Sequence, residues 1–137
     1  MASIRKEILL DRRPEEVWDV VRDVGAVHER FAAGFVVDTK LEGDARIVTF
    51  ANGFVARELI VTIDDEARRL AYAAVGGPLT HHNASFQVVA EGKERTRLIW
   101  IADLLPNELA PTIDGMMEQG VEAIRRTLSS ATVGHGL

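Results

Sequence analysis

The sequence contains no cysteine, and this absence excludes three kinds of chemistry at once. Without thiols the chain can form no disulfide bond, has no thiolate nucleophile and offers no sulfur ligand to a metal. Its stability therefore has to come from packing. A chain of 137 residues that is 47% hydrophobic can bury a substantial core. We predict a single domain over residues 1–137.

Clusters of positive charge and long apolar runs are also missing. The formal net charge is -5 at pH 7, and no run of Lys or Arg exceeds two residues, so the electrostatic footprint of a nucleic-acid-binding protein is absent. No stretch approaches the roughly 20 apolar residues of a membrane span, and the N-terminus lacks the apolar core of a signal peptide. We therefore expect a cytoplasmic protein with no nucleic-acid partner and no membrane insertion.

Familiar catalytic and cofactor-binding motifs are absent as well. The sequence has no nucleophile elbow, no phosphate-binding glycine loop and no metal-ligand spacing. His81 and His82 are adjacent in an expected strand, where consecutive side chains point to opposite faces and cannot chelate one ion together. We predict neither a metal site nor a cofactor.

The pattern that is present begins with a strand and two short helices. Alternation over Ile4–Leu10 predicts the strand, and Pro14 followed by two glutamates is typical of a helix N-terminus. Apolar residues at helical spacing continue this helix toward Gly25, where it should stop. A second short helix is expected over about 26–32.

Six strands should then follow one another directly. The turns between them are short, which predicts antiparallel neighbours, and Asn52-Gly53 is the strongest hairpin signal among them. The expected strands are Phe35–Leu41, Ala45–Ala51, Phe54–Ile63, Arg68–Val75, Thr80–Ala90 and Arg95–Leu104.

A long amphipathic helix completes the chain. Apolar residues recur at helical spacing from Leu109 to Leu128, and the tail from Ala131 to Leu137 is expected to fray. The order of elements predicts an α+β fold in which a seven-stranded curved antiparallel sheet surrounds the long C-terminal helix, with two short helices after the first strand.

This order of elements also predicts a cavity. A helix about 10 to 12 Å wide cannot cover seven strands spaced about 4.8 Å apart, so the sheet has to curl around the helix. Unfilled volume destabilises a protein by about 24 cal/mol per Å³, and a ligand is the usual reason to tolerate it. Gly115 and Gly120 in the helix either permit close approach to the sheet or leave room for a bound molecule. Met116 and Met117 suit either a flexible pocket wall or plain core.

Five segments match a known family pattern in order and spacing: Pro14–Val21, Gly43–Arg46, Val55–Leu59, Gly76–Asn83 and Leu98–Trp100. Through them the chain resembles the START-like, SRPBCC helix-grip superfamily, and within it the polyketide cyclase/dehydrase family. The resemblance implies a small hydrophobic ligand, of lipid, polyketide or aromatic type, held between the sheet and the C-terminal helix. One departure falls at residues 27–31, where related proteins often have tryptophan followed by proline, so we expect a different pocket mouth.

Glu58 is the first candidate site residue. The odd-numbered positions of its strand are the more apolar ones, which by alternation alone would send Glu58 to solvent. The family pattern instead points Glu58 into the cavity, as an anchor for hydrogen bonds or a general acid/base. The same register turns His82 and Phe86 inward, although His82 also fits an ordinary surface position.

The other candidates are the large side chains available for a pocket wall. The predicted ligand-binding set is Phe35, Phe50, Phe54, Glu58, Tyr72, His82, Phe86, Trp100, Met116, Met117 and Gly120. Each of these has ordinary packing or surface exposure as its alternative. Arg46 and Arg57 are expected to pair with carboxylates at the sheet surface, and His28 is expected either in solvent or near the entrance.

Three functions remain open at this stage. The first is a carrier or binder of a small hydrophobic molecule. The second is a polyketide cyclase or dehydratase, for which Glu58, His82 and Tyr72 are the candidate catalytic groups. The third is a module that binds another protein, although the sequence shows no exposed apolar stripe to support it. A homodimer is compatible with each of the three.

Overall fold

We describe residues 2–135 of a computed structural model of the chain, and the side chains of residues 2–129. The chain forms one seven-stranded antiparallel sheet in the order β1-β7-β6-β5-β4-β3-β2, so that the first and last strands are neighbours. The strands are β1 (Ala2–Leu10), β2 (Val36–Glu42), β3 (Ala45–Phe50), β4 (Val55–Asp64), β5 (Arg69–Val75), β6 (His81–Ala90) and β7 (Thr96–Leu105). This is the predicted α+β helix-grip architecture.

Four helical segments accompany the sheet. Between the first two strands lie α1 (Pro14–Val21) and a π-helical turn, η1 (Val27–Phe31). After β7 come a short 3-10 turn, η2 (Asn107–Leu109), and the long helix α2 (Ala110–His135). The expected second short helix is thus a π-helical turn. The helix is assigned through His135, and residues 136 and 137 of the tail that is expected to fray lie outside the described part.

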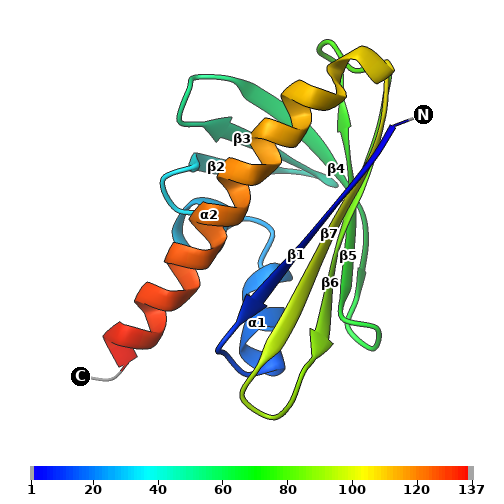
Figure 1. Cartoon of the computed structure of the whole chain (residues 1–137). Helices are drawn as coiled ribbons and strands as arrows, with labels where there is room; N and C mark the ends of the chain where they lie inside the picture. Colours follow the sequence, from blue (N-terminus) through cyan, green and yellow to red (C-terminus); the bar gives the residue numbers. More distant parts are fainter. Residues whose placement is uncertain (1, 136–137) are drawn as a thin grey trace.

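The long helix α2 covers only part of the concave side of the sheet. The helix runs diagonally across the concave side of the sheet, and its closest elements are β1 and η1 rather than the central strands (Figure 1). The shorter α1 covers another part of the sheet, where it contacts β6. The N-terminal half of α2 is therefore separated from the central strands, and only side chains can fill the space between them.

Alternation along the strands builds the core on this concave side. Even-numbered residues of β7 point inward, and Leu98 and Leu104 are fully buried there. Leu98 belongs to one buried apolar cluster with Ile8 of β1 and Ile124 and Leu128 of α2. Among the described residues, no helix is long and apolar enough to cross a membrane.

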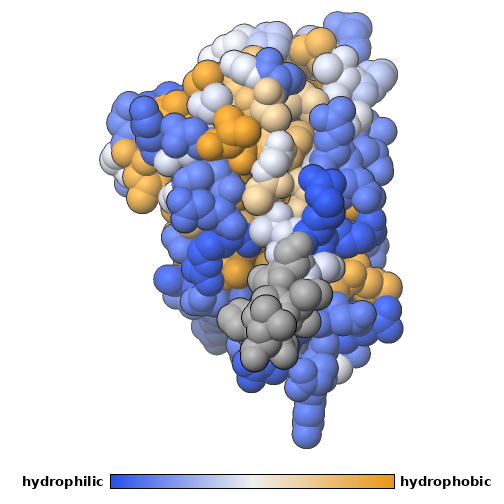
Figure 2. All heavy atoms as spheres, turned by 90° about the vertical axis from the view of Figure 1, so that its left-hand side faces the viewer, coloured by the Kyte–Doolittle hydropathy of each residue, from blue (hydrophilic) through white to orange (hydrophobic). Residues whose placement is uncertain are grey.

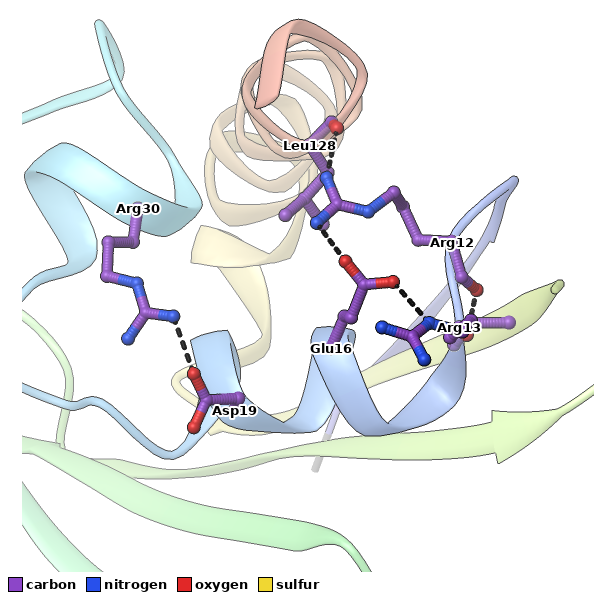
Figure 3. Close-up of polar contacts among 7 residues, drawn as sticks. Arg12, Arg13, Glu16, Asp19, Arg30 and Leu128 are labelled. Carbon is purple, nitrogen blue, oxygen red and sulfur yellow. Dashed lines mark hydrogen bonds and ion pairs between the residues drawn. The ribbon is translucent and has the colours of Figure 1, made fainter. Parts of the chain in front are cut away.

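Arg12 connects the start of α1 to α2. Its Nη1 donates a hydrogen bond to the backbone oxygen of Leu128 at 2.8 Å, and its Nη2 bonds Glu16 at 2.7 Å (Figure 3). Glu16 also accepts a hydrogen bond from Arg13 at 2.7 Å, and these arginines hold the pKa of the Glu16 carboxyl below its usual value. The start of α1 is thereby joined to α2.

Candidate functional site

The main cavity lies between the central strands and the N-terminal half of α2. Its volume is about 340 Å³, and its wall is mostly apolar. Exposed residues at its mouth come from the β3–β4 turn, the β5–β6 turn and the first turn of α2, and include Asn52, Pro78 and Thr112. Figure 2 shows apolar atoms gathered in the upper half of the α2 side of the molecule, whereas the lower half is mainly hydrophilic.

A second hollow, of about 560 Å³, lies on the opposite face of the sheet. It runs across the outer face of the sheet, past Arg5 and Asn83, which are exposed, and Asp103, which is half-buried. Its size alone does not make it the better site. The cavity under α2 combines an apolar wall with converging polar groups, which is the usual character of a small-molecule site.

Glu58 lies at the buried end of the main cavity. Arg46 stands opposite it on β3, and Arg46 Nε donates a hydrogen bond to Glu58 Oε1 at 2.8 Å. The two side chains are 5% and 11% exposed, so this is a buried ion pair. Among the described residues, Glu58 Oε2 has no protein hydrogen-bond partner, and this oxygen remains available to a molecule in the cavity.

Tyr72 lies beside this ion pair on β5. Its hydroxyl accepts a hydrogen bond from Trp100 Nε1 at 2.9 Å, and the Arg46 guanidinium lies 5.0 Å from the centre of its ring. Burial, reinforced by the negative charge of Glu58, raises the pKa of the Tyr72 phenol well above its usual range. The hydroxyl therefore stays protonated and can donate its hydrogen.

His82 supplies a third polar group from β6. The backbone N–H of Ala74 donates to His82 Nδ1 at 2.9 Å, so in the neutral imidazole the hydrogen is on Nε2. Burial lowers the pKa of His82, an effect that the nearby charge of Glu58 partly opposes. His82 is thereby held as a neutral hydrogen-bond donor in the cavity wall.

Aromatic rings build much of the remaining wall. Phe35 packs edge-on against Phe50 with ring centres 5.1 Å apart, and Phe50 stacks on Phe54 at 6.0 Å. Deeper in the fold, Trp100 stacks on Phe86 at 4.8 Å. These contacts fix the shape of the wall in the absence of any bound molecule.

A smaller cavity of about 70 Å³ lies behind the main one. Glu58, Tyr72 and Trp100 border both spaces, whereas Arg46 and Gly120 border only the inner one. A Cβ atom on Gly120 would lie 2.9 Å from two carbons of the Trp100 ring, which is too close. Gly120 thus permits close approach of α2 to β7. No neighbouring atom explains Gly115, whose Cβ position is open.

The structure brings the predicted site residues together around these two spaces. Nine line the main cavity: Phe35, Phe50, Phe54, Glu58, Tyr72, His82, Trp100, Met116 and Met117. Phe86 and Gly120 line the inner cavity instead. Their contribution to binding stays a prediction. His81, by contrast, is exposed on the outer face, opposite to His82.

Sequence reasoning missed two groups of residues that border the main cavity. One is the β5–β6 turn, Gly76–Leu79, which was assigned only to connecting structure. The other consists of Leu109 at the end of η2 and of Thr112 and Ile113 near the start of α2. Loop placement has no periodic signal, but the apolar spacing of α2 could have identified Ile113.

Three expectations need correction. The first concerns Arg46, which does not pair at the surface because β3 turns its side chain to the concave side of the sheet. Arg57 does pair at the surface, with Glu42.

The second correction concerns His28, which was expected either in solvent or near the entrance. It borders neither cavity under α2 and is half-buried, with no hydrogen-bond partner at Nδ1 among the described residues.

The third correction concerns exposed apolar surface, because the sequence showed no exposed apolar stripe and the structure has one on β4. Large apolar side chains of β4 are exposed, because the opposite face of this strand carries Ala56, Glu58 and Ile60 toward α2. The exposed large apolar residues of β4 are Val55, Leu59, Val61 and Ile63.

Several solved structures share this fold. An uncharacterized protein from Bacillus thuringiensis matches with a TM-score of 0.82 and 17% identity, over 93% of this chain and 98% of that one. A START superfamily protein from Mycobacterium smegmatis matches with a TM-score of 0.73 and 12% identity, over 94% and 95% of the two chains. At these identities the likeness establishes the fold alone.

A further match is the di-domain ARO/CYC protein BexL of the BE-7585A biosynthetic pathway, with a TM-score of 0.81 and 17% identity. It covers 96% of this chain and 48% of BexL, so the chain spans about half of that protein. No curated protein sequence matches the chain significantly.

The sequence itself gives the family. The profile described as polyketide cyclase / dehydrase and lipid transport matches residues 1–130. The chain therefore belongs to this family of the START-like SRPBCC superfamily, as the resemblance implied.

Proposed function

We propose that the protein binds a small, largely apolar molecule in the cavity between the central strands and α2. The observation that carries this proposal is the combination of an apolar wall around about 340 Å³ with a polar cluster of Glu58, Tyr72 and His82 at one place in it. Such a space would be costly if it served no purpose, since the stability lost grows with cavity volume. An apolar wall with a few convergent polar groups is the usual form of a ligand pocket.

Family membership supports the same proposal, because the family description includes lipid transport. A lipid, polyketide or aromatic molecule would each find apolar contacts along the phenylalanine wall. Met116 and Met117 at the α2 side add flexible, polarizable contacts that can adapt to more than one shape.

The experiment combines identification with a matched pair of variants. Native mass spectrometry of the purified protein should detect a co-purified small molecule, and adding that molecule should raise the thermal unfolding temperature. At 100 times its Kd a ligand stabilises the folded state by about 2.7 kcal/mol. Thr112→Trp, at the mouth, should abolish the shift, whereas Gln119→Trp, exposed elsewhere on α2, should keep it. A ligand shift that survives Thr112→Trp would contradict binding in this cavity.

A second candidate function is a cyclase or dehydratase, in which the bound molecule is also transformed. The observation that favours it is that Glu58, Tyr72 and His82 border one cavity with complementary roles. Glu58 Oε2 could take a proton from a carbon next to a carbonyl group, while His82 Nε2–H or the Tyr72 hydroxyl donates to the resulting oxyanion. The solved BexL structure shows that an ARO/CYC protein uses this fold.

Turnover separates the two functions. The enzyme predicts that the identified ligand, or a precursor of it, is converted at a saturable rate that Glu58→Gln abolishes while binding persists. The carrier predicts recovery of the unchanged ligand after prolonged incubation.

We also propose that the protein is a single domain and that it is cytoplasmic. A homodimer is a further possibility for the oligomeric state. Sedimentation of the purified chain will distinguish a monomer from a homodimer.

A further inference from the structure

The charged groups around the cavity form a neutral pair. Of the described residues that line the main cavity, Glu58 is the only Asp or Glu, and none is Lys or Arg. The positive charge of Arg46 lies directly behind this carboxylate, 2.8 Å from it, and borders only the inner cavity. A bound molecule therefore meets one carboxylate whose charge is already balanced.

Arg46 is already engaged by Glu58 and does not border the main cavity. Its Nε bonds Glu58, its Nη1 faces the backbone oxygen of Val24 at 3.5 Å, and its guanidinium lies against the Tyr72 ring. These contacts hold the guanidinium on the far side of Glu58 from the mouth. A ligand carboxylate entering the main cavity would approach the Glu58 carboxylate before it reached Arg46.

Of the remaining polar side chains, Asn52 and Thr112 lie at the mouth of the cavity, and the two near Glu58 are donors. His82 carries its hydrogen on Nε2, because Nδ1 accepts from the Ala74 backbone. The Tyr72 hydroxyl already accepts from Trp100, which leaves its own hydrogen to be donated. The part of the cavity around Glu58 thus offers one free carboxylate oxygen, Glu58 Oε2, together with two neutral donors.

Resting on the proposed binding function, we infer that the cavity selects an uncharged ligand with a hydroxyl group at its polar end. The hydroxyl donates to Glu58 Oε2 and accepts from His82 Nε2 or the Tyr72 hydroxyl. A hydroxyl is the smallest group that does both, and it leaves the Arg46–Glu58 pair intact.

Charged ends fit this set of partners less well. A carboxylate would be buried beside Glu58 without a cation of its own, which costs much of its hydration energy. An ammonium group would compete with Arg46 for Glu58, and its hydrogens would face the N–H of His82 and the O–H of Tyr72. A hydrocarbon end would leave Glu58 Oε2 without a partner.

The test uses four probes that share one ring system: 2-methylnaphthalene, 2-naphthylmethanol, 2-naphthoate and 2-naphthylmethylammonium. Titration calorimetry at pH 7.5 measures the Kd of each for the wild-type protein. We expect the alcohol to bind about tenfold more tightly than 2-methylnaphthalene, and both charged probes to bind at least about tenfold more weakly than the alcohol. Either charged probe binding as tightly as the alcohol would overturn the inference while leaving the binding function in place. Failure of all four probes to bind would overturn the binding function with it.

The substitution Glu58→Gln should change which probes the cavity prefers. The variant keeps the size of the side chain but frees the positive charge of Arg46, so the affinity for 2-naphthoate should rise by about tenfold relative to wild type. Glu42→Gln removes a carboxylate that pairs with Arg57 at the surface, and it should leave all four affinities unchanged. An unchanged preference for the alcohol over 2-naphthoate in folded Glu58→Gln would contradict charge selection by Glu58. The titrations of the wild-type protein with the four probes test the inference even if no variant folds.

Discussion

Arg46 and Glu58 face each other across β3 and β4, and the hydrogen bond between Arg46 Nε and Glu58 Oε1 measures 2.8 Å. Each charge is buried only because the other is present. The pair links the wall of the main cavity to the inner cavity, and Arg46 extends the connection toward the backbone of Val24 after α1. The stability of this part of the sheet should therefore depend on both partners together.

Removing one partner of the pair should be strongly destabilising. In Arg46→Met the Glu58 carboxylate loses its counter-ion, and we expect the free energy of unfolding to fall by about 3 to 5 kcal/mol. Urea denaturation at pH 7.5 measures the change. Arg57→Met, which breaks only the exposed pair with Glu42, should cost less than about 1 kcal/mol. The double variant Arg46→Met/Glu58→Leu should recover much of the loss, and no recovery would contradict the coupling.

Gly120→Ala should destabilise the protein even though alanine favours helices. The added Cβ would lie 2.9 Å from the Trp100 ring, and that ring is held by Phe86 and by the hydrogen bond to Tyr72. We expect a net loss of about 1 to 3 kcal/mol from overpacking, measured by thermal or urea unfolding.

Gly115→Ala is the matched control on the same helix. No atom lies within 4 Å of the Cβ position there, so only the helix preference of alanine remains. The expected result is a gain of up to about 1 kcal/mol. Equal effects of the two substitutions would refute the contrast between a close-packed and an open position.

His82 should make the protein less stable in mild acid. Burial lowers its folded-state pKa, whereas the unfolded chain takes up a proton near pH 6.5. As the pH falls below that value the unfolded state binds more protons, so the stability contributed by neutral His82 is lost, by at most about 1.4 kcal/mol per pH unit. Unfolding free energies at pH 7.5 and pH 5.5 measure the loss.

His82→Gln should reduce this pH dependence, because glutamine does not titrate. His81→Gln is the control, since His81 is exposed on the other face of the same strand. A wild-type slope that His82→Gln leaves unaltered would assign the pH dependence to another group.

Arg12→Met should loosen the connection between α1 and α2. The side chain is 10% exposed, and its Nη1 bonds the backbone oxygen of Leu128 (Figure 3). A lost hydrogen bond from a charged donor costs about 1.5 to 3 kcal/mol. Hydrogen exchange should accelerate at the amides of α2 around Leu128, whereas the more exposed Arg13→Met should leave them protected. Equal protection in both variants would contradict the connection.

Much of the fold could be predicted because its signals are local. Turn residues and strand alternation located all seven strands, and helical spacing located α2 from its start to Leu128. The π-helical turn at Val27–Phe31 carries no such signal, because its apolar residues also fit an ordinary helical turn. In the structure this turn packs against β2 and α2, contacts that a local pattern does not contain.

The site was harder to predict, because β4 reverses the usual distribution of apolar residues. Its outward side chains include Leu59 and Val61, which are exposed, while Glu58 faces the cavity. Alternation therefore pointed Glu58 the wrong way, and the family pattern pointed it correctly. The burial of Arg46 depends on the register of β3 against β4, a relationship between distant parts of the chain that periodicity does not contain.

Trp100 borders both cavities, and the only other tryptophan of the chain, Trp18, is bonded to Asp65 by its indole nitrogen. The protein thus carries its own fluorescent reporter of occupancy. In Trp18→Phe all tryptophan emission would come from Trp100, whose indole senses both the polarity of the cavity and its hydrogen bond to Tyr72. Filling of the cavity can then be followed in real time without a label.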